Sequence, residues 1–350
     1  MKRLCGFGIA VVALAALFGT GGQAFAAQVS CGQVITQDTR VDNDLIDCPG
    51  DGLVIGADDV TLDLNRHTID GTGVGIGVLN GVFGGAEGHE RVTVENGTVR
   101  EFDVGVFFAG ANDGAIRAVA ASSNKDGIYL SGSNGNQIER YKVTGNSRGD
   151  GGGIRLLGSL ANVVERNVAS SNFNAGIVVQ EQGFGTVGNT ISDNLTTDNA
   201  HGIGVGNAVH TNIEGNASLR DETGISLGGF GTVVSRNRLS EDGEGIRLSG
   251  AAFALIRRNA ISDSQRSGIA LVPGLFESNE SVQIVHNSSS HNGDDGILIS
   301  GSGPDIHLSR NSTNRNADLG IEALAFVFDD GGNKAHGNGN PLQCVGVACR

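Results

Sequence analysis

The fold is decided by a motif that recurs within residues 237–271, whose sequence is NRLSEDGEGIRLSGAAFALIRRNAISDSQRSGIAL. An asparagine is followed, eight or nine residues later, by glycine, an aliphatic residue, a variable residue and a second aliphatic residue. The two copies begin at Asn237 and Asn259, so the period is about 22 residues. Self-similarity at a period of this size indicates a repeat protein whose units stack on one another.

The glycine of this motif recurs along most of the chain, with a column of asparagines before it. The glycines are Gly52, Gly75, Gly105, Gly127, Gly153, Gly176, Gly202, Gly224, Gly245, Gly268, Gly296 and Gly320. The asparagines are Asn96, Asn167, Asn194, Asn216, Asn237, Asn259, Asn287 and Asn311, and Ala118 and Tyr141 stand near the expected place in two coils that break the column. A glycine kept at one place in each repeat indicates a backbone site that is either left-handed or crowded.

Short strands fill the space between these columns. Ile246–Leu248 and Ile297–Ile299 alternate apolar with variable residues, as strands with one buried face do. Coils stacked about 4.8 Å apart would pair each strand with its copies above and below, and the asparagines would hydrogen-bond along the axis as an amide ladder. We therefore predict an all-β fold, a single-stranded right-handed parallel β-helix (a solenoid) of about 12 coils with terminal caps.

The first residues are typical of a secretory signal peptide. Lys2 and Arg3 precede an apolar run at 9–18, and small residues lead to Ala26, which completes the three parts of such a signal. We expect cleavage near Ala26 and a protein that is secreted or lies in the cell envelope or periplasm, with no membrane span in the mature chain. The expected domains are a signal peptide (1–26), an N-terminal cap (27–50), the β-helix (51–325) and a C-terminal cap (326–350).

The charge of the chain excludes one class of partner. The formal net charge is −14, and removal of Lys2 and Arg3 with the signal would make it −16. Nucleic acid requires a basic surface, so we expect no nucleic-acid partner. The balance is compatible with an extracellular protein or with one that binds cations.

Four cysteines would remain after cleavage, as one local pair at each end. We expect disulfides between Cys31 and Cys48 and between Cys344 and Cys349, because an even count in an exported protein indicates a disulfide framework. Neither pair has the spacing or the histidine partners of a zinc site, so we assign no metal to them. Both terminal segments would cover the strand edges that a solenoid otherwise exposes.

These columns resemble the parallel β-helix repeats of the pectin-lyase-like superfamily, which includes NosD-type periplasmic proteins. The opening residues 60–65 (VTLDLN) and 67–71 (HTIDG) are similar to the first coils of secreted bacterial members, and the resemblance covers residues 50–325. It implies the fold but no single activity, because lyases, hydrolases, epimerases and non-catalytic proteins share this fold. No three histidines converge by register, so the copper association of NosD-type proteins finds no ligand cluster here.

Acidic residues gather just before the recurring glycine. Asp294 and Asp318 hold the same place in adjacent coils and Asp295 follows Asp294, so the three carboxylates could act on a glycosidic bond or hold calcium, with Arg266 one coil away. Residues 292–297 (NGDDGI) resemble the aspartate-pair motif of polygalacturonases, but the accompanying N-T-D, G-H-G and R-I-K motifs are absent. Aspartate before glycine is also ordinary turn chemistry, so chance pairing stays open.

Basic residues form a second column directly before the asparagines. Its members are Arg140, Arg166, Arg236, Arg258, His286 and Arg310. If the asparagines point inward, these side chains point outward as a stripe that suits an anionic polysaccharide, because arginine binds carboxylates in a bidentate manner. The alternative is a solvated face that balances the acidic turns.

Longer insertions leave one corner of the cross-section, around residues 79–90, 180–188 and 272–281. Loops on one edge commonly wall a binding groove. Phenylalanines stand nearly in register near this corner, at Phe83, Phe184, Phe230, Phe253 and Phe276. We expect them to pack against each other, because the absence of Trp and scarcity of Tyr weaken the case for sugar stacking.

Three functions follow from these features. The first is a secreted β-helix protein that binds surface or extracellular polysaccharide without catalysis, with Arg236, Arg258, Arg266, His286 and Arg310 as binding residues. The second is a polysaccharide lyase, hydrolase or epimerase acting on an acidic glycan, with Asp294, Asp295 and Asp318 as the catalytic groups. The third is a periplasmic metal-handling protein. No cofactor is assigned, and calcium is left open.

Overall fold

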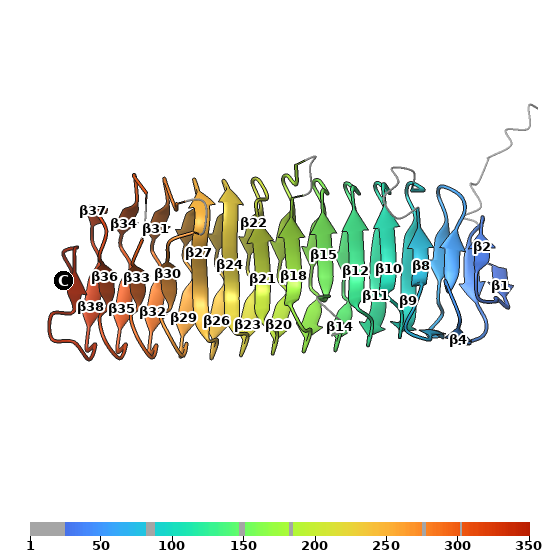
Figure 1. The fold of residues 1–350 in the computed structure, drawn as a ribbon, viewed down its shortest axis with the longest axis horizontal. Coiled ribbons are helices and arrows are strands. Elements are labelled where there is room, and N and C mark those ends of the chain that lie inside the picture. The colour runs from blue at the N-terminus through green and yellow to red at the C-terminus, as the bar shows by residue number, and fades with distance from the viewer. Residues whose placement is uncertain (1–24, 82–87, 147–150, 182–184, 275–277, 302) are drawn as a thin grey trace, which may run out of the picture.

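The computed structural model describes residues 25–81, 88–146, 151–181, 185–274, 278–301 and 303–350. Within these residues all regular secondary structure is β-strand, stacked as a parallel solenoid of about 13 turns. The predicted fold class is therefore confirmed, with about one turn more than expected. Figure 1 shows the strands of each sheet side by side along one long axis.

One strand of each turn belongs to a 14-stranded parallel sheet, which we call sheet B. Its strands are β2 (Gln33–Ile35), β5 (Leu53–Ile55), β8 (Ile76–Asn80), β10 (Val104–Ala109), β12 (Asp126–Ser131), β15 (Ile154–Leu157), β18 (Ala175–Gln180), β21 (His201–Gly206), β24 (Thr223–Phe230), β27 (Glu244–Ala252), β30 (Ile269–Leu271), β33 (Ile297–Ile299), β36 (Ile321–Ala323) and β39 (Cys344–Val345).

The other strands form two further faces, which β9 (Thr93–Arg100) and β11 (Ala115–Ser122) join into one 25-stranded sheet because each pairs on both. Face 1 also contains β1 (Phe25–Ala27), β3 (Thr39–Val41), β6 (Thr61–Asp63), β13 (Gln137–Glu139), β16 (Val163–Glu165), β19 (Thr190–Ser192), β22 (Asn212–Glu214), β25 (Val233–Ser235), β28 (Leu255–Arg257), β31 (Gln283–Val285), β34 (His307–Ser309) and β37 (Phe328–Gly331). Face 2 also contains β4 (Leu45–Cys48), β7 (Thr68–Gly71), β14 (Lys142–Thr144), β17 (Val168–Ser170), β20 (Leu195–Thr197), β23 (Ala217–Leu219), β26 (Arg238–Ser240), β29 (Ala260–Ser262), β32 (Ser288–Ser290), β35 (Ser312–Asn314) and β38 (Lys334–His336).

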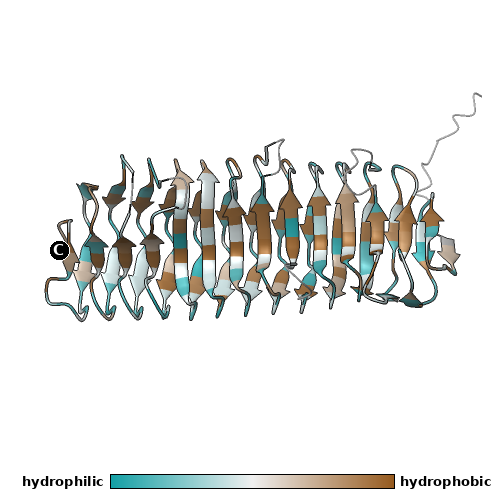
Figure 2. Ribbon diagram, viewed as in Figure 1, coloured by the Kyte–Doolittle hydropathy of each residue, from teal (hydrophilic) through white to brown (hydrophobic). Residues whose placement is uncertain are grey.

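The chain passes through face 1, face 2 and sheet B in that order in most turns, so the solenoid has three edges. Edge 1 joins face 1 to face 2, edge 2 joins face 2 to sheet B, and edge 3 joins sheet B to face 1. Alternate side chains of the strands point inward; in β12, for example, Ile128 and Leu130 are fully buried. Figure 2 shows hydrophobic bands along the strands and more hydrophilic turns, so the edges carry most of the polar chemistry.

The predicted amide ladder lies inside edge 1. Each asparagine donates from Nδ2 to Oδ1 of the next, at 2.9–3.1 Å, through Asn167, Asn194, Asn216, Asn237, Asn259, Asn287, Asn311 and Asn333. Asn96 was wrongly assigned to this column. It lies in register with Ala118, whereas Gly97 and Val119 hold the ladder position, so Asn96 is exposed and bonds to Asp63.

A second buried ladder runs inside edge 2 and contains two acids. Asparagines bond in series through Asn124, Asn146, Asn172 and Asn199, and Asn199 donates to Asp221 Oδ1 at 2.9 Å. Asp242 and Ser264 fill the next two rungs, and the asparagine series resumes with Asn292, Asn316 and Asn338. A shorter series through Asn136, Asn162 and Asn189 lies inside edge 3.

Crowding explains the glycine column. From Gly105 to Gly296, a Cβ added at these glycines would lie within 3.0 Å of the carbonyl oxygen of the equivalent glycine one turn on. These glycines do not have positive φ. Gly75, which does, was wrongly assigned to the column: the strand register places Gly77 opposite Gly105, and a Cβ on Gly77 would lie 2.6 Å from the Gly105 carbonyl oxygen. Of the two explanations left open by the sequence, the close approach of backbones is therefore the correct one for most of the column.

The terminal segments extend the ladder and carry the predicted disulfides. Cys31–Cys48 and Cys344–Cys349 are both formed. β2 pairs with β5 at one end and β39 with β36 at the other, so the segments expected to be caps also add strands. Most of the expected signal peptide lies outside the described residues, while residues 25–27, around the expected cleavage point, pair with β3. No helix in the described part of the chain is long and apolar enough to cross a membrane.

Candidate functional site

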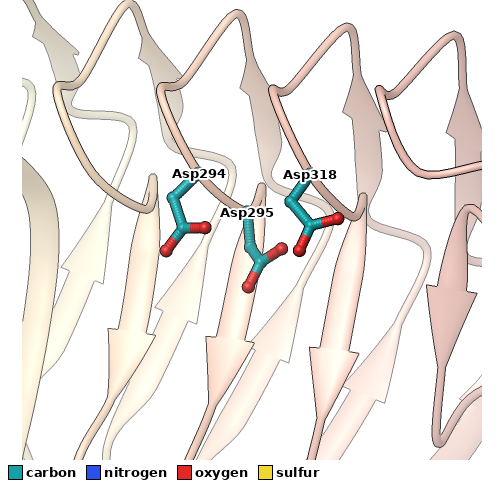
Figure 3. A group of neighbouring side chains, drawn as sticks. All are labelled: Asp294, Asp295 and Asp318. Carbon is teal, nitrogen blue, oxygen red and sulfur yellow. The ribbon is translucent and has the colours of Figure 1, made fainter.

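The three predicted acidic residues converge on edge 2. Asp294 and Asp318 hold equivalent places on consecutive turns, where Asp318 N–H donates to the Asp294 carbonyl at 3.2 Å, and Asp295 lies between their side chains (Figure 3). One carboxylate oxygen from each lies within 4.8 Å of the others. The repeat brings them together, because each turn places the residues before its glycine at the same point of the edge.

Asp295 is the most perturbed member of this acidic cluster. It is 1% exposed, and its Oδ1 accepts the Leu319 N–H at 2.9 Å. Burial raises the pKa of Asp295 to about 7, and the carboxylates of Asp294, Glu322 and Asp318 add to the rise. The half-buried partners also have hydrogen bonds, Asp294 from Ser267 Oγ at 3.3 Å and Asp318 from Asn340 Nδ2 at 2.9 Å.

This arrangement can hold a proton or a hard cation. A carboxyl with a pKa near neutrality can give or take a proton at physiological pH. Three carboxylates on one point of the surface are also the oxygen ligands that calcium prefers. The bond from Leu319 N–H is not special to this site, because Asp126, in the same column, accepts the Gly152 N–H at 2.9 Å. The buried conformation of Asp295 is therefore in part a feature of the repeat.

Arg266 lies one turn before Asp294, as its place in the sequence indicates. Its ion pair, however, is with Glu244 and not with the acidic cluster. Its guanidinium lies 4.0 Å from Glu244 Oε2, which also accepts from Arg247 at 2.9 Å. Glu244 is only 3% exposed, and a buried carboxylate without a partner would cost stability. The two arginines compensate its charge.

The basic column is exposed along edge 1. Every member precedes the asparagine ladder and has positive φ, near 55°, so the ladder residue points in while its neighbour points out. The members are Arg140, Arg166, Arg236, Arg258, His286 and Arg310. Arg236 pairs with Glu214 and Arg166 with Glu165. Arg258 and Arg310 form no ion pair with any residue that the structure describes.

The column is not continuous. Asp193 and Gly215 hold its position in the two turns between Arg166 and Arg236. Beyond them Arg236, Arg258, His286 and Arg310 follow one another on consecutive turns. Arg257, at the end of β28 on face 1, and Arg238, at the start of β26 on face 2, flank the edge on its two sides. The four predicted binding residues of this column therefore form one uninterrupted block in the C-terminal half.

The sequence pattern missed the chemistry of edge 3. His307 bonds to Asp305 and Asp330, and its ring stacks on Phe328. Only the local Asp-x-His spacing could have indicated this group, because Asp330 comes from the next turn. Of the phenylalanines expected to pack, Phe230 and Phe253 do so, with ring centroids 4.6 Å apart. Phe83, Phe184 and Phe276 lie outside the described residues.

Two family models match the sequence. The family described as "Periplasmic copper-binding protein (NosD)" matches residues 32–183 and 65–227. The family described as "Right handed beta helix region" matches residues 180–340. No curated protein matches the sequence.

Solved structures with the same fold include two epimerases. The A-module of the Azotobacter vinelandii mannuronan C-5 epimerase AlgE6 has a TM-score of 0.53 at 16% identity, covering 89% of this chain and 91% of that one. A double mutant of the periplasmic alginate epimerase AlgG has a TM-score of 0.56 at 12% identity, covering 91% of this chain and 78% of that one. At such identities the likeness shows the fold alone.

The two NosD matches overlap and together span residues 32–227, more than half of the 350 residues. The remaining turns match the general right-handed β-helix model, and the structure continues the same ladders through them. The chain therefore belongs to the NosD family of right-handed parallel β-helix proteins.

Proposed function

We propose that this protein binds an acidic polysaccharide outside the cytoplasm, along the basic column of edge 1. One observation carries the proposal: Arg236, Arg258, His286 and Arg310 are exposed on four consecutive turns. Neighbouring members lie about 4.8 Å apart along the axis, a spacing comparable to the length of one sugar residue. Successive uronate groups can therefore meet successive members of the column.

The local charge is what makes this surface selective. The whole chain has a formal net charge of −14, so an acidic polymer is repelled by most of the molecule and attracted to this edge. Arg258 and Arg310 have no ion pair with described residues to give up, so their guanidinium groups can accept a uronate without first losing an internal partner. Guanidinium–carboxylate pairs are geometrically specific, and exposed ones weaken with salt.

The disulfides support the location. Structural disulfides form and persist in oxidising compartments and are rare in the cytosol, and this chain has one near each end. A polysaccharide of the cell envelope or of the surroundings is the partner that such a compartment offers.

The test is binding of oligomannuronate and oligogalacturonate by the protein with Arg258→Gln and Arg310→Gln combined. We expect at least 10-fold weaker binding at low salt, measured by calorimetry, because two guanidinium–carboxylate pairs are lost. The matched control is Arg220→Gln, which changes another exposed arginine, one that pairs with Asp198 on edge 2. Equal affinity of the double variant and the original protein, or no binding of either oligomer, would contradict the proposal.

The acidic cluster supports a second candidate, acid–base chemistry on a glycan. It is favoured by the pKa of Asp295, raised to about 7 by burial, with Asp294 and Asp318 beside it. Asp295 would supply the proton and a partner carboxylate would act as the base. Release of products in the same incubations, abolished by Asp295→Asn and Asp318→Asn, is the outcome that would favour this candidate over simple binding.

Copper does not fit the described residues. It prefers imidazole and sulfur ligands, but the four described cysteines are in disulfides, and the group of three ligating side chains found among these residues is entirely carboxylate. Calcium fits that group better, because it takes oxygen ligands from carboxylates. We therefore derive no step through copper.

A further inference from the structure

Edge 3 contains a pocket of about 460 Å³ that neither the basic column nor the acidic cluster uses. Phe253 lines one end of it, and His307 with Asp330 lines the other. Between them lie Gln283, which pairs with Leu255 on one side and His307 on the other, and Ser281. The pocket therefore extends over consecutive turns, with about two rises of 4.8 Å between the turn of Leu255 and that of His307.

Exposed aromatic rings stand at both ends of this pocket. Phe230 and Phe253 contact each other at one end and are 43% and 53% exposed. At the other end Phe328, 43% exposed, stacks on His307 with centroids 4.8 Å apart and an angle of 17° between the rings. Phe326 packs edge-on against Phe328 and is 75% exposed. Large apolar surfaces gathered at one place on a soluble protein indicate a binding site.

The histidine between these rings is held rigidly. Nδ1 of His307 lies 2.8 Å from Asp330 and Nε2 lies 3.0 Å from Asp305, which also accepts from Ser281 Oγ at 3.0 Å. Both nitrogens can donate only when the ring is protonated, and the two carboxylates raise the pKa of His307 accordingly. With both nitrogens engaged, the ring is a flat wall of the pocket and has no nitrogen left for a metal.

We propose that this pocket is a binding site for the pyranose ring of a neutral glycan. Aromatic rings spaced to flank the pocket can stack on the C–H face of a sugar. The remaining lining, from Ser281, Gln283, Asp305 and Asp330, offers acceptors and donors for hydroxyl groups. The two carboxylates would repel a uronate, so this site differs in ligand class from the basic column. It lies on another edge and does not depend on the proposed function.

The aromatic rings at the two ends of the pocket are not part of the core that stacks the turns. Phe253 has positive φ at an exposed turn, and Phe328 lies outside the packed core. Ser281 and Asp305, at the same place on the next two turns, also have positive φ, so this conformation belongs to the repeat and the exposed ring is the feature particular to Phe253. Ser281, which follows the longer connection between β30 and β31, also lines the pocket.

The experiment measures binding of cellohexaose, mannohexaose and xylohexaose by the disulfide-bonded protein, using calorimetry and the histidine side-chain resonances in nuclear magnetic resonance spectra. We expect at least one of these neutral hexaoses to bind, to shift the His307 resonances, and to lose 10-fold or more in affinity with Phe253→Ala or Phe328→Ala. The matched control is Phe173→Ala, a 63% exposed phenylalanine on edge 2, which should leave the affinity unchanged. Circular dichroism verifies that each variant is folded.

Distinct outcomes separate this site from the basic column. Arg258→Gln with Arg310→Gln should leave neutral-hexaose binding intact, and Phe253→Ala should leave oligomannuronate binding intact. The inference is overturned if none of the three neutral hexaoses binds, or if Phe173→Ala weakens binding as much as Phe253→Ala does. It is also overturned if Phe253→Ala abolishes self-association of the protein without any effect of a hexaose, since the rings would then form a protein interface.

Discussion

Single residues set how closely the turns approach. At Gly245 an added Cβ would meet the carbonyl oxygen of Gly268 and the Ile261 side chain, and neither can move away without shifting the next turn. The spacing of the glycines was readable from the sequence, because it repeats. The physical reason for these glycines was not readable from the sequence. A left-handed backbone and a close approach between backbones both require glycine, so both would produce the same repeating pattern.

Gly245→Ala is therefore expected to destabilise the protein by more than about 2 kcal/mol, in the range of overpacked interiors. The measurement is the midpoint of chemical unfolding followed by circular dichroism. Gly50→Ala is the matched control, since a Cβ there meets nothing within 4 Å and its φ is not positive. Equal stability of the two variants would mean that the turns are not as closely stacked as described.

At the scale of the elements, the amide ladders hold the edges in register. The ladder of edge 1 was predictable because asparagine fills it without interruption from Asn167 onward. The ladder of edge 2 was not, because Asp221, Asp242 and Ser264 interrupt its asparagines and hide the period. Asn96 shows why spacing along the sequence is not enough to assign a residue to a ladder. An error of one position moves a side chain from the buried ladder to the surface.

The two acids of the second ladder make stability depend on pH. Asp242 is fully buried, its Oδ1 accepts from Asp221 N–H and Ser218 Oγ, and its Oδ2 has no hydrogen-bond partner. Burial raises the pKa of Asp242 to about 7, and the nearby Asp221 adds to this rise. The folded state thus keeps a proton that the unfolded chain releases near the ordinary aspartate pKa of 3.8. The contribution of Asp242 to stability is complete below that value and is lost as pH rises to about 7.

Asp242→Asn removes this penalty and restores an amide to the ladder. We expect the variant to gain roughly 2 kcal/mol at pH 8, within the limit of about 4 kcal/mol that three pKa units allow, and little at pH 4. Thermal unfolding at the two pH values measures the difference. Asp263→Asn, an exposed aspartate on the next turn, is the control and should show no such dependence. If the free energy of unfolding rose by the same amount at both pH values, the stability would not depend on the protonation of Asp242, and the prediction would be wrong.

At the scale of the whole molecule, stacking gives each edge its own chemistry. Edge 1 carries the basic column, edge 2 the acidic cluster and edge 3 the aromatic pocket. The first two were predictable, because residues at a fixed offset from a repeating glycine or asparagine share an edge. The pocket was not, because Phe253, His307 and Asp330 come from different turns at unequal offsets and meet only once the insertions are placed.

The most direct test of the account is a hydrogen–deuterium exchange footprint of oligomannuronate on the disulfide-bonded protein. If register places one basic residue of edge 1 on each turn, saturation should slow exchange in four separate stretches, around Arg236, Arg258, His286 and Arg310, and leave the intervening strands unchanged. Protection confined to the turns of Asp294 and Asp318, or spread over one continuous segment, would contradict the claim that the stacked basic column is the binding surface.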